Sequence, residues 1–389
     1  MSLSKFLVRY GRTTLHFGPG TADSLRSWLS SFKRVYVVTS RNAAKVSGAL
    51  GDVLELLNHG GIKYEIFDGV LANPTASIVD RVAENAWRFG AEAMVAIGGG
   101  SVIDTAKIAS VIVECGGKAS EYLKRYRDVC GALKIAAVNL THGTGSEVNR
   151  YAVATIEETK EKLSIASEYI YPSIGVDDPR YTTTLPKNQT IYTALDAFYH
   201  ALEASTGRFT TPFAWTLGET AIKLIVKWLP IAVRMPGNLE ARYWLLYASA
   251  IAGMAVDNSR THLIHAVEHV LSGLEPRLAH GAGLGAIGPS AIELLYSIVP
   301  ERLHGLLKYL DPDLEPTQEH SAKAATTVKK FQEEVGFTET LLDYGFTPDM
   351  ASRVSEMALT STRYLLDLAP IDVGKDLIEK IYLRSLGRT

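Results

Sequence analysis

The 389-residue chain has little of several features that mark specialised classes of protein. Its two cysteines, Cys115 and Cys130, are too few for a disulfide framework in a chain of this size, which favours a reducing compartment. A formal net charge of -2 gives no overall basic field to concentrate nucleic acid. The longest apolar run, residues 245–256, is too short to cross a bilayer and predicts a buried helix.

The N-terminal residues 1–20 carry charges and glycines where a signal peptide would need an unbroken apolar segment. We therefore expect a cytoplasmic protein that binds neither nucleic acid nor a membrane. Hydrophobic residues make up 47% of the chain and charged residues 21%, which is typical of a globular protein with a large core. The length predicts two domains.

The hydrophobic pattern changes near residue 180. Before it, short β-branched runs at residues 34–40, 92–98 and 134–140 alternate with helical segments such as residues 76–90, which predicts a parallel sheet covered on both faces. After it, long segments with a 3.6-residue period, such as residues 190–206 and 321–336, predict helices. The expected fold is an α/β domain over residues 1–180 followed by an all-helical domain over residues 181–389.

A glycine turn between a strand and a helix predicts a phosphate site in the first domain. Gly98, Gly99 and Gly100 let the backbone approach a ligand, and the helix that follows offers free N–H groups and a positive dipole end. Ser101 adds a hydroxyl group. Ser101 and Asp104 also have the spacing of a capping box on that helix, and we expect both roles.

A second loop, residues 140–149, follows the third predicted strand and pairs two glycines with Thr141, Thr144 and Ser146. It is compatible with an ordinary turn or with ligand contact. The G-x-G-x-x-G at residues 283–288 follows no strand, so it does not indicate a dinucleotide site and instead predicts tight helix packing. G-x-S-x-G and H-E-x-x-H are absent from the sequence, so neither a serine hydrolase nor a zincin is indicated.

Histidines in the second half have the spacing of metal ligands. Asp196 and His200 lie four residues apart on one face of a predicted helix, His265 and His269 repeat this spacing, and His280 precedes a glycine. One carboxylate with several imidazoles suits Fe(II), Zn(II) or another borderline divalent metal. His262 lies one turn before the second pair, so the spacing alone leaves open which imidazoles bind.

Motifs along nearly the whole chain resemble those of the iron-containing alcohol dehydrogenase family. They are FGPG (17–20), NPT (73–75), GGGSVIDTAK (98–107), GTGSE (143–147), DP and LP within 178–186, D-x3-H (196–200), H-x3-H (265–269) and HG (280–281). The order and spacing of such a series are highly specific.

The resemblance implies a dehydroquinate synthase-like fold, with a Rossmann-like N-terminal domain, a helical C-terminal domain and a cofactor cleft between them. It implies four metal ligands, with His269 beside the metal and facing the substrate, and a structural role for His262. The implied ligands are Asp196, His200, His265 and His280. The expected cofactor-binding residues are Ser40, Arg41, Asn73, Gly99, Gly100, Ser101, Asp104, Thr141, Thr144 and Lys162. A homodimer or larger homo-oligomer is also expected.

The chain departs from the family pattern in two places. Leu140, Thr141 and His142 stand where relatives commonly have Thr-Thr-Ala, which removes one hydroxyl near the cofactor. Residues 259–261 replace a glycine-rich stretch before the H-x3-H motif, and Val256 stands where relatives can have Phe. The substrate therefore does not follow from the resemblance.

The expected reaction is hydride transfer between a nicotinamide cofactor and a small alcohol, aldehyde or ketone bound at Fe2+, Zn2+ or another divalent metal. NADP(H) is expected over NAD(H), because Ser40 and Arg41 end the first strand without the carboxylate that would bind the ribose of NAD. Alternatively, Arg41 is a solvated surface charge. The alternative functions are a glycerol dehydrogenase, a dehydroquinate synthase-like cyclase and a non-enzymatic metal- or nucleotide-binding assembly protein.

Overall fold

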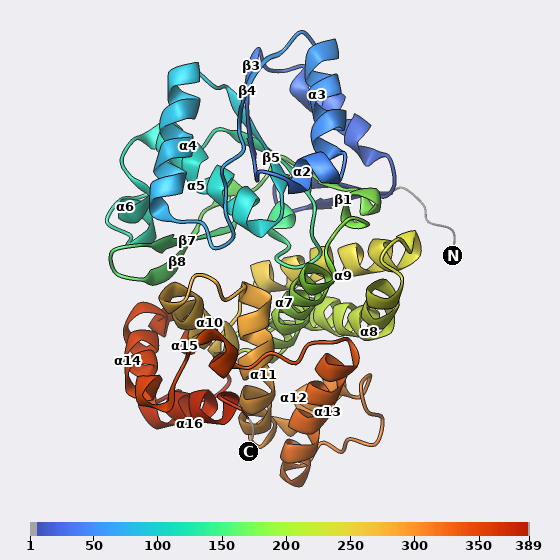
Figure 1. Ribbon diagram of the computed structural model, residues 1–389, viewed down its shortest axis with the longest axis vertical. Helices are drawn as coiled ribbons and strands as arrows, with labels where there is room; N and C mark the ends of the chain where they lie inside the picture. Colours follow the sequence, from blue (N-terminus) through green and yellow to red (C-terminus); the bar gives the residue numbers. More distant parts are fainter. Residues whose placement is uncertain (1–5, 388–389) are drawn as a thin grey trace. The chain divides into compact units, whose positions relative to one another are not determined.

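A computed structural model describes residues 6–387, in two compact units (Figure 1). Unit 1 comprises the described residues up to Leu185 together with Pro236–Leu246, and unit 2 comprises Pro186–Met235 and the described residues from Tyr247. The strands all belong to unit 1: β1 (Phe6–Tyr10), β2 (Thr13–Phe17), β3 (Arg34–Thr39), β4 (Lys63–Phe67), β5 (Ala93–Gly98), β6 (Lys134–Asn139), β7 (Tyr151–Ile156), β8 (Glu161–Ala166) and β9 (Ile174–Asp177).

Seven of these strands form one sheet in the order β1-β2-β9-β6-β5-β3-β4. The strands from β2 to β4 in this order are parallel, and β1 adds an antiparallel edge. The helices of unit 1 are α1 (Leu25–Leu29), α2 (Ala43–Val46), α3 (Ala49–His59), α4 (Ala76–Phe89), α5 (Gly100–Cys115) and α6 (Ala119–Leu123). The parallel sheet predicted from the β-branched runs is confirmed.

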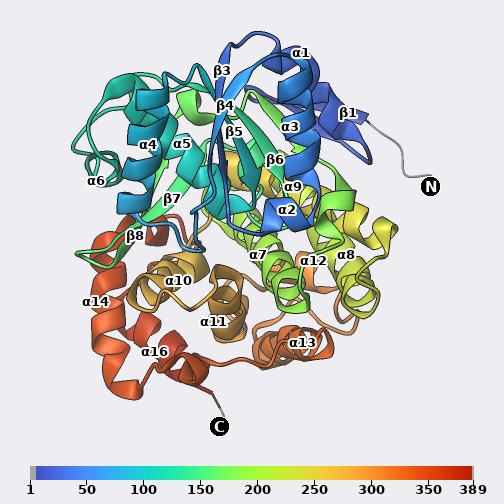
Figure 2. The same ribbon diagram turned by 45° about the horizontal axis from the view of Figure 1, so that its top comes forward.

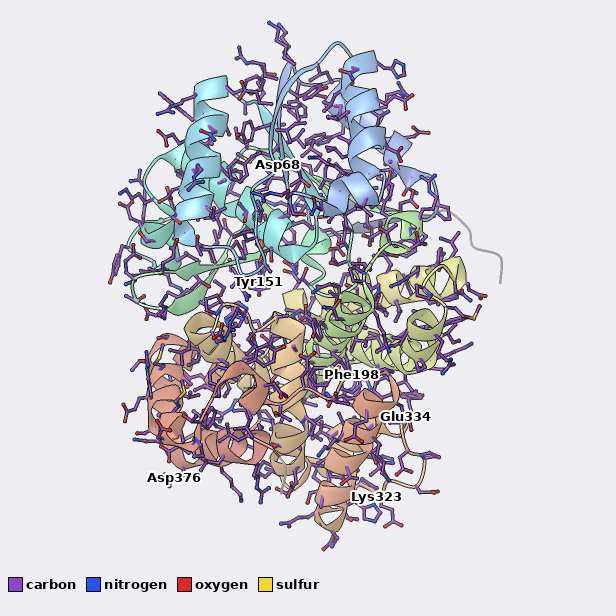
Figure 3. The ribbon with its side chains drawn as sticks, in the orientation of Figure 1. Asp68, Tyr151, Phe198, Lys323, Glu334 and Asp376 are labelled. Atoms are coloured by element: carbon purple, nitrogen blue, oxygen red, sulfur yellow. A yellow bond between two sulfur atoms is a disulfide. The ribbon has the colours of Figure 1, made fainter. Side chains whose placement is uncertain are left out.

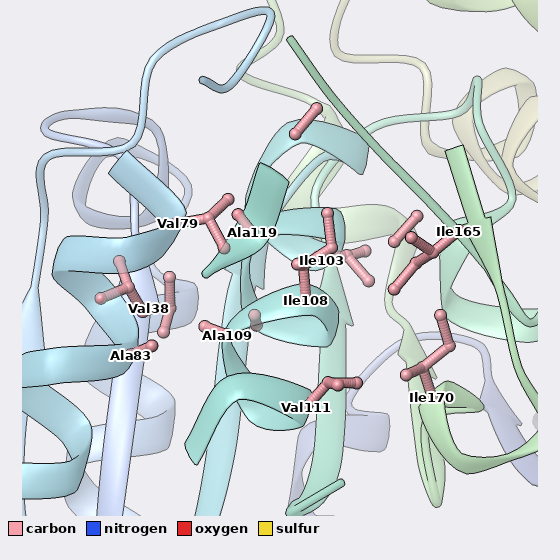
Figure 4. Packing of buried hydrophobic residues seen from close by; sticks show 14 of the residues in the cluster. Val38, Val79, Ala83, Ile103, Ile108, Ala109, Val111, Ala119, Ile165 and Ile170 are labelled. Atoms are coloured by element: carbon pink, nitrogen blue, oxygen red, sulfur yellow. The ribbon is translucent and has the colours of Figure 1, made fainter. Parts of the chain in front are cut away.

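The strands are apolar on both faces because helices cover both. Val35 and Val37 of β3 pack in the core with α1 and α3, whereas Tyr36 and Val38 pack in a second core with α4 and α5. Figure 2 shows α3 and α4 on opposite sides of the sheet, and Figure 4 shows Val38 among residues of the second core. This alternation follows from the two-residue period of a strand.

The sheet places the ends of its central strands along one edge. Thr39 pairs with Ile97, Gly98 with Asn139, and Val138 with Val176. The loops that follow β3, β5 and β6 therefore lie at the same carboxyl edge, where open α/β sheets bind their ligands.

Unit 2 is helical throughout the part of the chain that the structure describes, as predicted. Its helices are α7 (Lys187–Thr206), α8 (Pro212–Arg234), most of α9 (Leu239–Ser259), α10 (Leu263–Leu274), α11 (His280–Tyr296), α12 (Pro300–Leu307), α13 (Ser321–Glu334), α14 (Ala351–Ser361), α15 (Arg363–Leu366) and α16 (Lys375–Ser385). In Figure 3, Phe198 lies among these helices while Lys323, Glu334 and Asp376 lie on their outer surface. The predicted buried helix at residues 245–256 is part of α9.

Glycines explain the close packing of α11. A Cβ atom at Gly283 would lie 2.8 Å from Glu268 Cγ, and one at Gly288 would lie 1.9 Å from Tyr199 Oη. The G-x-G-x-x-G motif therefore serves helix packing, as predicted. No described helix has both the length and the hydropathy needed to span a membrane.

The cysteines correct the expectation of reduced thiols. Cys115 and Cys130 form a disulfide with a Cα–Cα distance of 5.9 Å. They meet because the chain turns back after α5 and runs toward β6, which lies next to β5 in the sheet. The reducing compartment inferred from cysteine usage loses this support, and the cytoplasmic location stays a prediction.

Candidate metal centre and cofactor loops

Three helices of unit 2 bring the predicted metal ligands together. Asp196 and His200 lie on α7, His265 lies on α10 and His280 is the first residue of α11. Gly281 allows α11 to approach α7, because a Cβ atom there would lie 1.9 Å from the Tyr192 carbonyl oxygen. A glycine after His280 is therefore a packing requirement of the site.

Asp196 Oδ1 is the centre of the cluster. It lies 3.4 Å from His200 Nδ1, 3.8 Å from His265 Nε2 and 3.6 Å from His280 Nε2. The rings of His200 and His265 stack with centroids 4.6 Å apart. Asp196, His265 and His280 offer donor atoms that all lie within 4.8 Å of one another, and His200 adjoins this trio.

The buried atoms of this cluster fit a divalent metal. Asp196 Oδ1 and His265 Nε2 are both buried and have no hydrogen-bond partner, which is costly unless another group binds them. A carboxylate oxygen with imidazole nitrogens is a donor set for Fe2+ or Zn2+. The arrangement thus provides converging lone pairs on side chains that are mostly buried.

The electrostatics of the cluster favour an ionised carboxylate. Burial alone would raise the pKa of Asp196, but the imidazoles of His200, His280 and His265 outweigh it and lower this pKa to about 2. Burial would likewise lower the pKa of His265, but Asp196 and Glu203 raise it to about 9. A metal ligand must be neutral imidazole, so binding a metal displaces a proton here.

Two buried glutamates, which the sequence reasoning missed, orient the imidazoles. Glu203 Oε2 lies 2.6 Å from His265 Nδ1, and Glu268 Oε2 contacts His280 Nδ1. Each glutamate therefore fixes the proton on Nδ1 and leaves Nε2 directed toward Asp196. Glu203 also accepts hydrogen bonds from the backbone N–H groups of His262, Ile264 and His265, so it ties the start of α10 to α7.

Signals for both glutamates are present in the sequence. Glu203 lies seven residues after Asp196 and so on the same face of α7. Glu268 interrupts the apolar helix LIHAVEHVLSGL, where an unpaired charge would be costly. Carboxylates at these positions are typical of groups that support metal-binding histidines.

His269 and His262, the two other histidines near the cluster, differ in their surroundings. His269 is buried on α10, with its ring centroid 5.6 Å from that of His280. Glu268, His269 and His280 form a second group of converging donor atoms. His262 contacts Glu203 Oε1 at 3.0 Å and Thr206 Oγ1 at 3.1 Å, so it links α7 to the start of α10.

Two loops of unit 1 pack directly against each other at the carboxyl edge of the sheet. A Cβ atom at Gly99 would lie 2.7 Å from Thr141 Cγ2, and one at Gly100 would lie 2.3 Å from Thr144 Cγ2. The structure thus brings these four predicted cofactor residues together. Gly99 is the N-cap of α5 and no side chain caps the helix, which suits an N-terminus that binds a phosphate.

The predicted capping box of Ser101 and Asp104 is wrong. Helix α5 begins at Gly100 and its N-cap is Gly99, so Ser101 lies inside the helix, two residues after the cap position. Asp104 instead accepts hydrogen bonds from Ser146 Oγ at 2.6 Å and from the Val153 N–H at 2.9 Å. Its carboxylate therefore connects the second loop to strand β7.

Lys107, for which the sequence predicted no role, supports the same loop. Its buried ammonium donates to Ser146 Oγ, to the Asn149 carbonyl oxygen and to the Tyr151 carbonyl oxygen at 2.8–2.9 Å. The lysine of the GGGSVIDTAK motif thus connects α5 to the end of the GTGSE loop.

The unpredicted hairpin β7–β8 brings Lys162 to Asn73. Thr155 pairs with Lys162 across the hairpin and bridges to Thr75. Lys162 Nζ lies 3.2 Å from Asn73 Oδ1. Ser40 and the exposed Arg41 follow β3, at the same sheet edge as Gly99.

Comparisons with known proteins agree with this arrangement. Residues 12–179 match the family model "Iron-containing alcohol dehydrogenase", and residues 190–386 match "Fe-containing alcohol dehydrogenase family, C-terminal". The long-chain primary alcohol dehydrogenase AdhA of Thermoanaerobacter ethanolicus is 39% identical over 382 residues, which is 96% of each chain.

Solved structures share the fold over the whole chain. An archaeal halo-thermophilic alcohol dehydrogenase from a Red Sea brine pool has a TM-score of 0.92 at 26% identity and covers 99% of each chain. The NADH-dependent butanol dehydrogenase A of Thermotoga maritima has a TM-score of 0.88 at 27% identity, over 98% of this chain and 99% of its own.

Proposed function

Because the chain belongs to the iron-containing alcohol dehydrogenase family, we propose that it transfers a hydride between NAD(P)(H) and a small alcohol or the corresponding aldehyde or ketone. The observation that carries this proposal is the convergence of Asp196, His265 and His280, with partnerless atoms of Asp196 and His265 facing each other. Membership of the family implies an oxidoreductase that acts on alcohols and uses a divalent metal and a nicotinamide cofactor.

The proposed ligands of that metal are Asp196, His200, His265 and His280. Bound there, a divalent ion would supply Lewis acidity toward the oxygen of an alcohol or carbonyl substrate. Glu203 and Glu268 hold the rings of His265 and His280 so that each Nε2 is directed toward Asp196. Asp196 is the one charged group among the four proposed ligands, so a divalent ion with these ligands would keep a net positive charge that could stabilise negative charge on the substrate oxygen.

His269 is proposed to move the proton of the substrate hydroxyl. Its ring lies beside His280, yet it belongs to a different donor group from that of Asp196 and His265. Imidazole exchanges protons near neutral pH, with an ordinary pKa of about 6.5. His269→Ala should keep its metal and show a lower rate with a changed pH profile. Loss of the metal would make His269 a ligand instead.

The glycine loops are proposed to bind the dinucleotide. Gly99, Gly100 and Ser101 open α5, and Thr141 and Thr144 face these glycines from the second loop. The pyrophosphate would bind at the N-terminus of α5. Asn73 and Lys162, which contact each other, would bind a more distant part of the cofactor.

A panel of substrates separates this function from its rivals. The purified, metal-loaded protein should oxidise NADPH or NADH with simple aldehydes, followed by absorbance. Turnover with glycerol alone would indicate a glycerol dehydrogenase. Cyclisation without net cofactor oxidation would indicate a dehydroquinate synthase-like enzyme, and no turnover with any substrate would indicate an assembly protein. The homo-oligomer expected from the sequence stays a prediction that light scattering tests.

We further propose that NADP(H) is preferred over NAD(H). Ser40 and the exposed Arg41 offer a hydroxyl and a guanidinium to a 2′-phosphate. The carboxylate of Asp68, which follows the neighbouring strand β4, already contacts a cation, because Lys45 Nζ lies 3.4 Å from it. We expect kcat/KM to favour NADPH by at least about tenfold, the size of one charge-assisted contact. Ser40→Asp should weaken NADPH more than NADH. Equal values for the two cofactors in the unmodified protein would refute the preference.

A further inference from the structure

The loop after β6 depends on its neighbours for its position. Thr141 and Thr144 press on Gly99 and Gly100 with no room for a Cβ atom, so a small shift of this loop would obstruct or open the N-terminus of α5. The loop is held at its start, where the Thr141 N–H donates to Asn139 Oδ1 at 3.1 Å. It is held at its end, where Asn149 Nδ2 donates to the Gly145 carbonyl oxygen at 2.9 Å.

His142 lies between these two anchors and points into the protein. Its side chain is fully buried, and its Nε2 lies 3.1 Å from Nη1 of Arg242. A guanidinium only donates hydrogen bonds, so Nε2 must accept and the ring proton must lie on Nδ1. Burial and the Arg242 charge lower the pKa of His142 to about 3, which keeps the imidazole a neutral acceptor.

Arg242 comes from a distant part of the sequence. It is fully buried in the first turn of α9, and its Nε donates to the Pro236 carbonyl oxygen at 3.0 Å. Pro236–Leu246 clusters with unit 1 although the residues on both sides of it belong to unit 2. The next residue, Tyr243, packs edge-on against Phe17 of β2 at a centroid distance of 5.0 Å, which anchors this segment to the sheet.

We propose that His142 and Arg242 are a positioning pair that holds the Thr141–Thr144 loop against the N-terminus of α5 and thereby sets the affinity for the dinucleotide. The inference rests on the proposed function, since it assigns a role at the same cofactor site. Neither side chain has to touch the reacting atoms.

The test compares two variants of His142. His142→Ala removes the acceptor, and His142→Gln restores a neutral acceptor at nearly the distance of Nε2. We expect His142→Ala to weaken the Kd for NADPH, measured by fluorescence titration, by about tenfold, the usual effect of losing a hydrogen bond to a charged group. His142→Gln should recover most of the affinity. Metal content should be unchanged in both, and KM for the cofactor should change more than kcat.

Two further variants sharpen the result. Arg242→Met should reproduce the loss of affinity seen with His142→Ala. His320→Ala removes an imidazole that accepts a hydrogen bond from the Glu315 N–H far along the chain, in unit 2, and should leave the Kd unchanged. If the unmodified protein binds NADPH and His142→Ala binds it equally well, the positioning role of His142 is overturned and the proposed function still stands. An unmodified protein that binds neither NADPH nor NADH would overturn the proposed function and the inference together.

Discussion

Single residues in the metal cluster act through their hydrogen-bond partners as much as through their own donor atoms. His265 and His280 could each present either ring nitrogen to a metal, and a buried glutamate at Nδ1 decides the choice in both. The i,i+4 spacings of the sequence indicated Asp196, His200, His265 and His269 as candidates and left the choice among the imidazoles open, and the resemblance to the family implied the set that includes His280. The spacings did not identify Glu203 and Glu268, because their role depends on how α7, α10 and α11 cross.

A neutral amide in place of Glu268 tests this role at the residue scale. Glu268→Gln keeps the size of the side chain but removes its charge, so His280 becomes a poorer ligand. We expect metal affinity to fall about tenfold, within the range usual for such supporting carboxylates. Competition against a chelator of known affinity measures it. Glu293→Gln is the control on the neighbouring helix α11, since Glu293 contacts Arg384 at 2.8 Å and lies outside the cluster. Equal losses in both variants would remove the assignment.

Helices and strands with a strong hydrophobic periodicity were predictable from the sequence. Elements whose position depends on packing against other elements were not. The buried runs of β3, β5 and β6 and the amphipathic helices α4, α7 and α13 lie where the pattern put them. The hairpin β7–β8 was missed because its short strands are stabilised by packing on α5 rather than by a long apolar run. The capping box failed because the end of a helix depends on local backbone geometry that a spacing rule does not contain.

The glycines of α11 give a prediction at the scale of the element. Gly288→Ala places a methyl group 1.9 Å from Tyr199 Oη, so α7 and α11 must move apart. We expect the free energy of unfolding to fall by about 1–3 kcal/mol, measured by denaturant titration. Gly51→Ala is the matched control, because a Cβ atom in that helix meets nothing within 4 Å. This control should be neutral or slightly stabilising. A Gly288→Ala variant as stable as the control would contradict the tight packing.

The stability of the whole molecule depends on a pair of buried carboxyl groups in unit 1. Glu147 and Asp177 are fully buried, and Glu147 Oε1 and Oε2 have no hydrogen-bond partner. Burial raises the pKa of Glu147 to about 7, and burial together with Glu147 raises the pKa of Asp177 well above its ordinary range. The folded chain therefore holds protons that the unfolded chain releases at lower pH.

The contribution of Glu147 to stability is complete below pH 4.5, the ordinary pKa, and is lost as pH rises through about 7. Glu147→Gln keeps a neutral side chain at every pH. Relative to the unmodified protein, this variant should gain stability between pH 5 and 8, on the order of 3 kcal/mol at full effect. Urea unfolding at several pH values measures it, with the exposed Glu55→Gln as control. Parallel pH profiles for Glu147→Gln and the unmodified protein would refute the prediction.

The glycine loops predicted to bind the cofactor belong to unit 1, and the cluster proposed to bind a metal belongs to unit 2. We propose that the cluster around Asp196 holds one divalent metal on which alcohol oxidation and carbonyl reduction depend. Metal content and hydride turnover measured together on His280→Ala test it most directly, with His320→Ala as control. His280→Ala should lose metal and turnover together, should still bind NADPH and should not be rescued by added Fe2+ or Zn2+. Full metal occupancy with normal turnover in His280→Ala would contradict it.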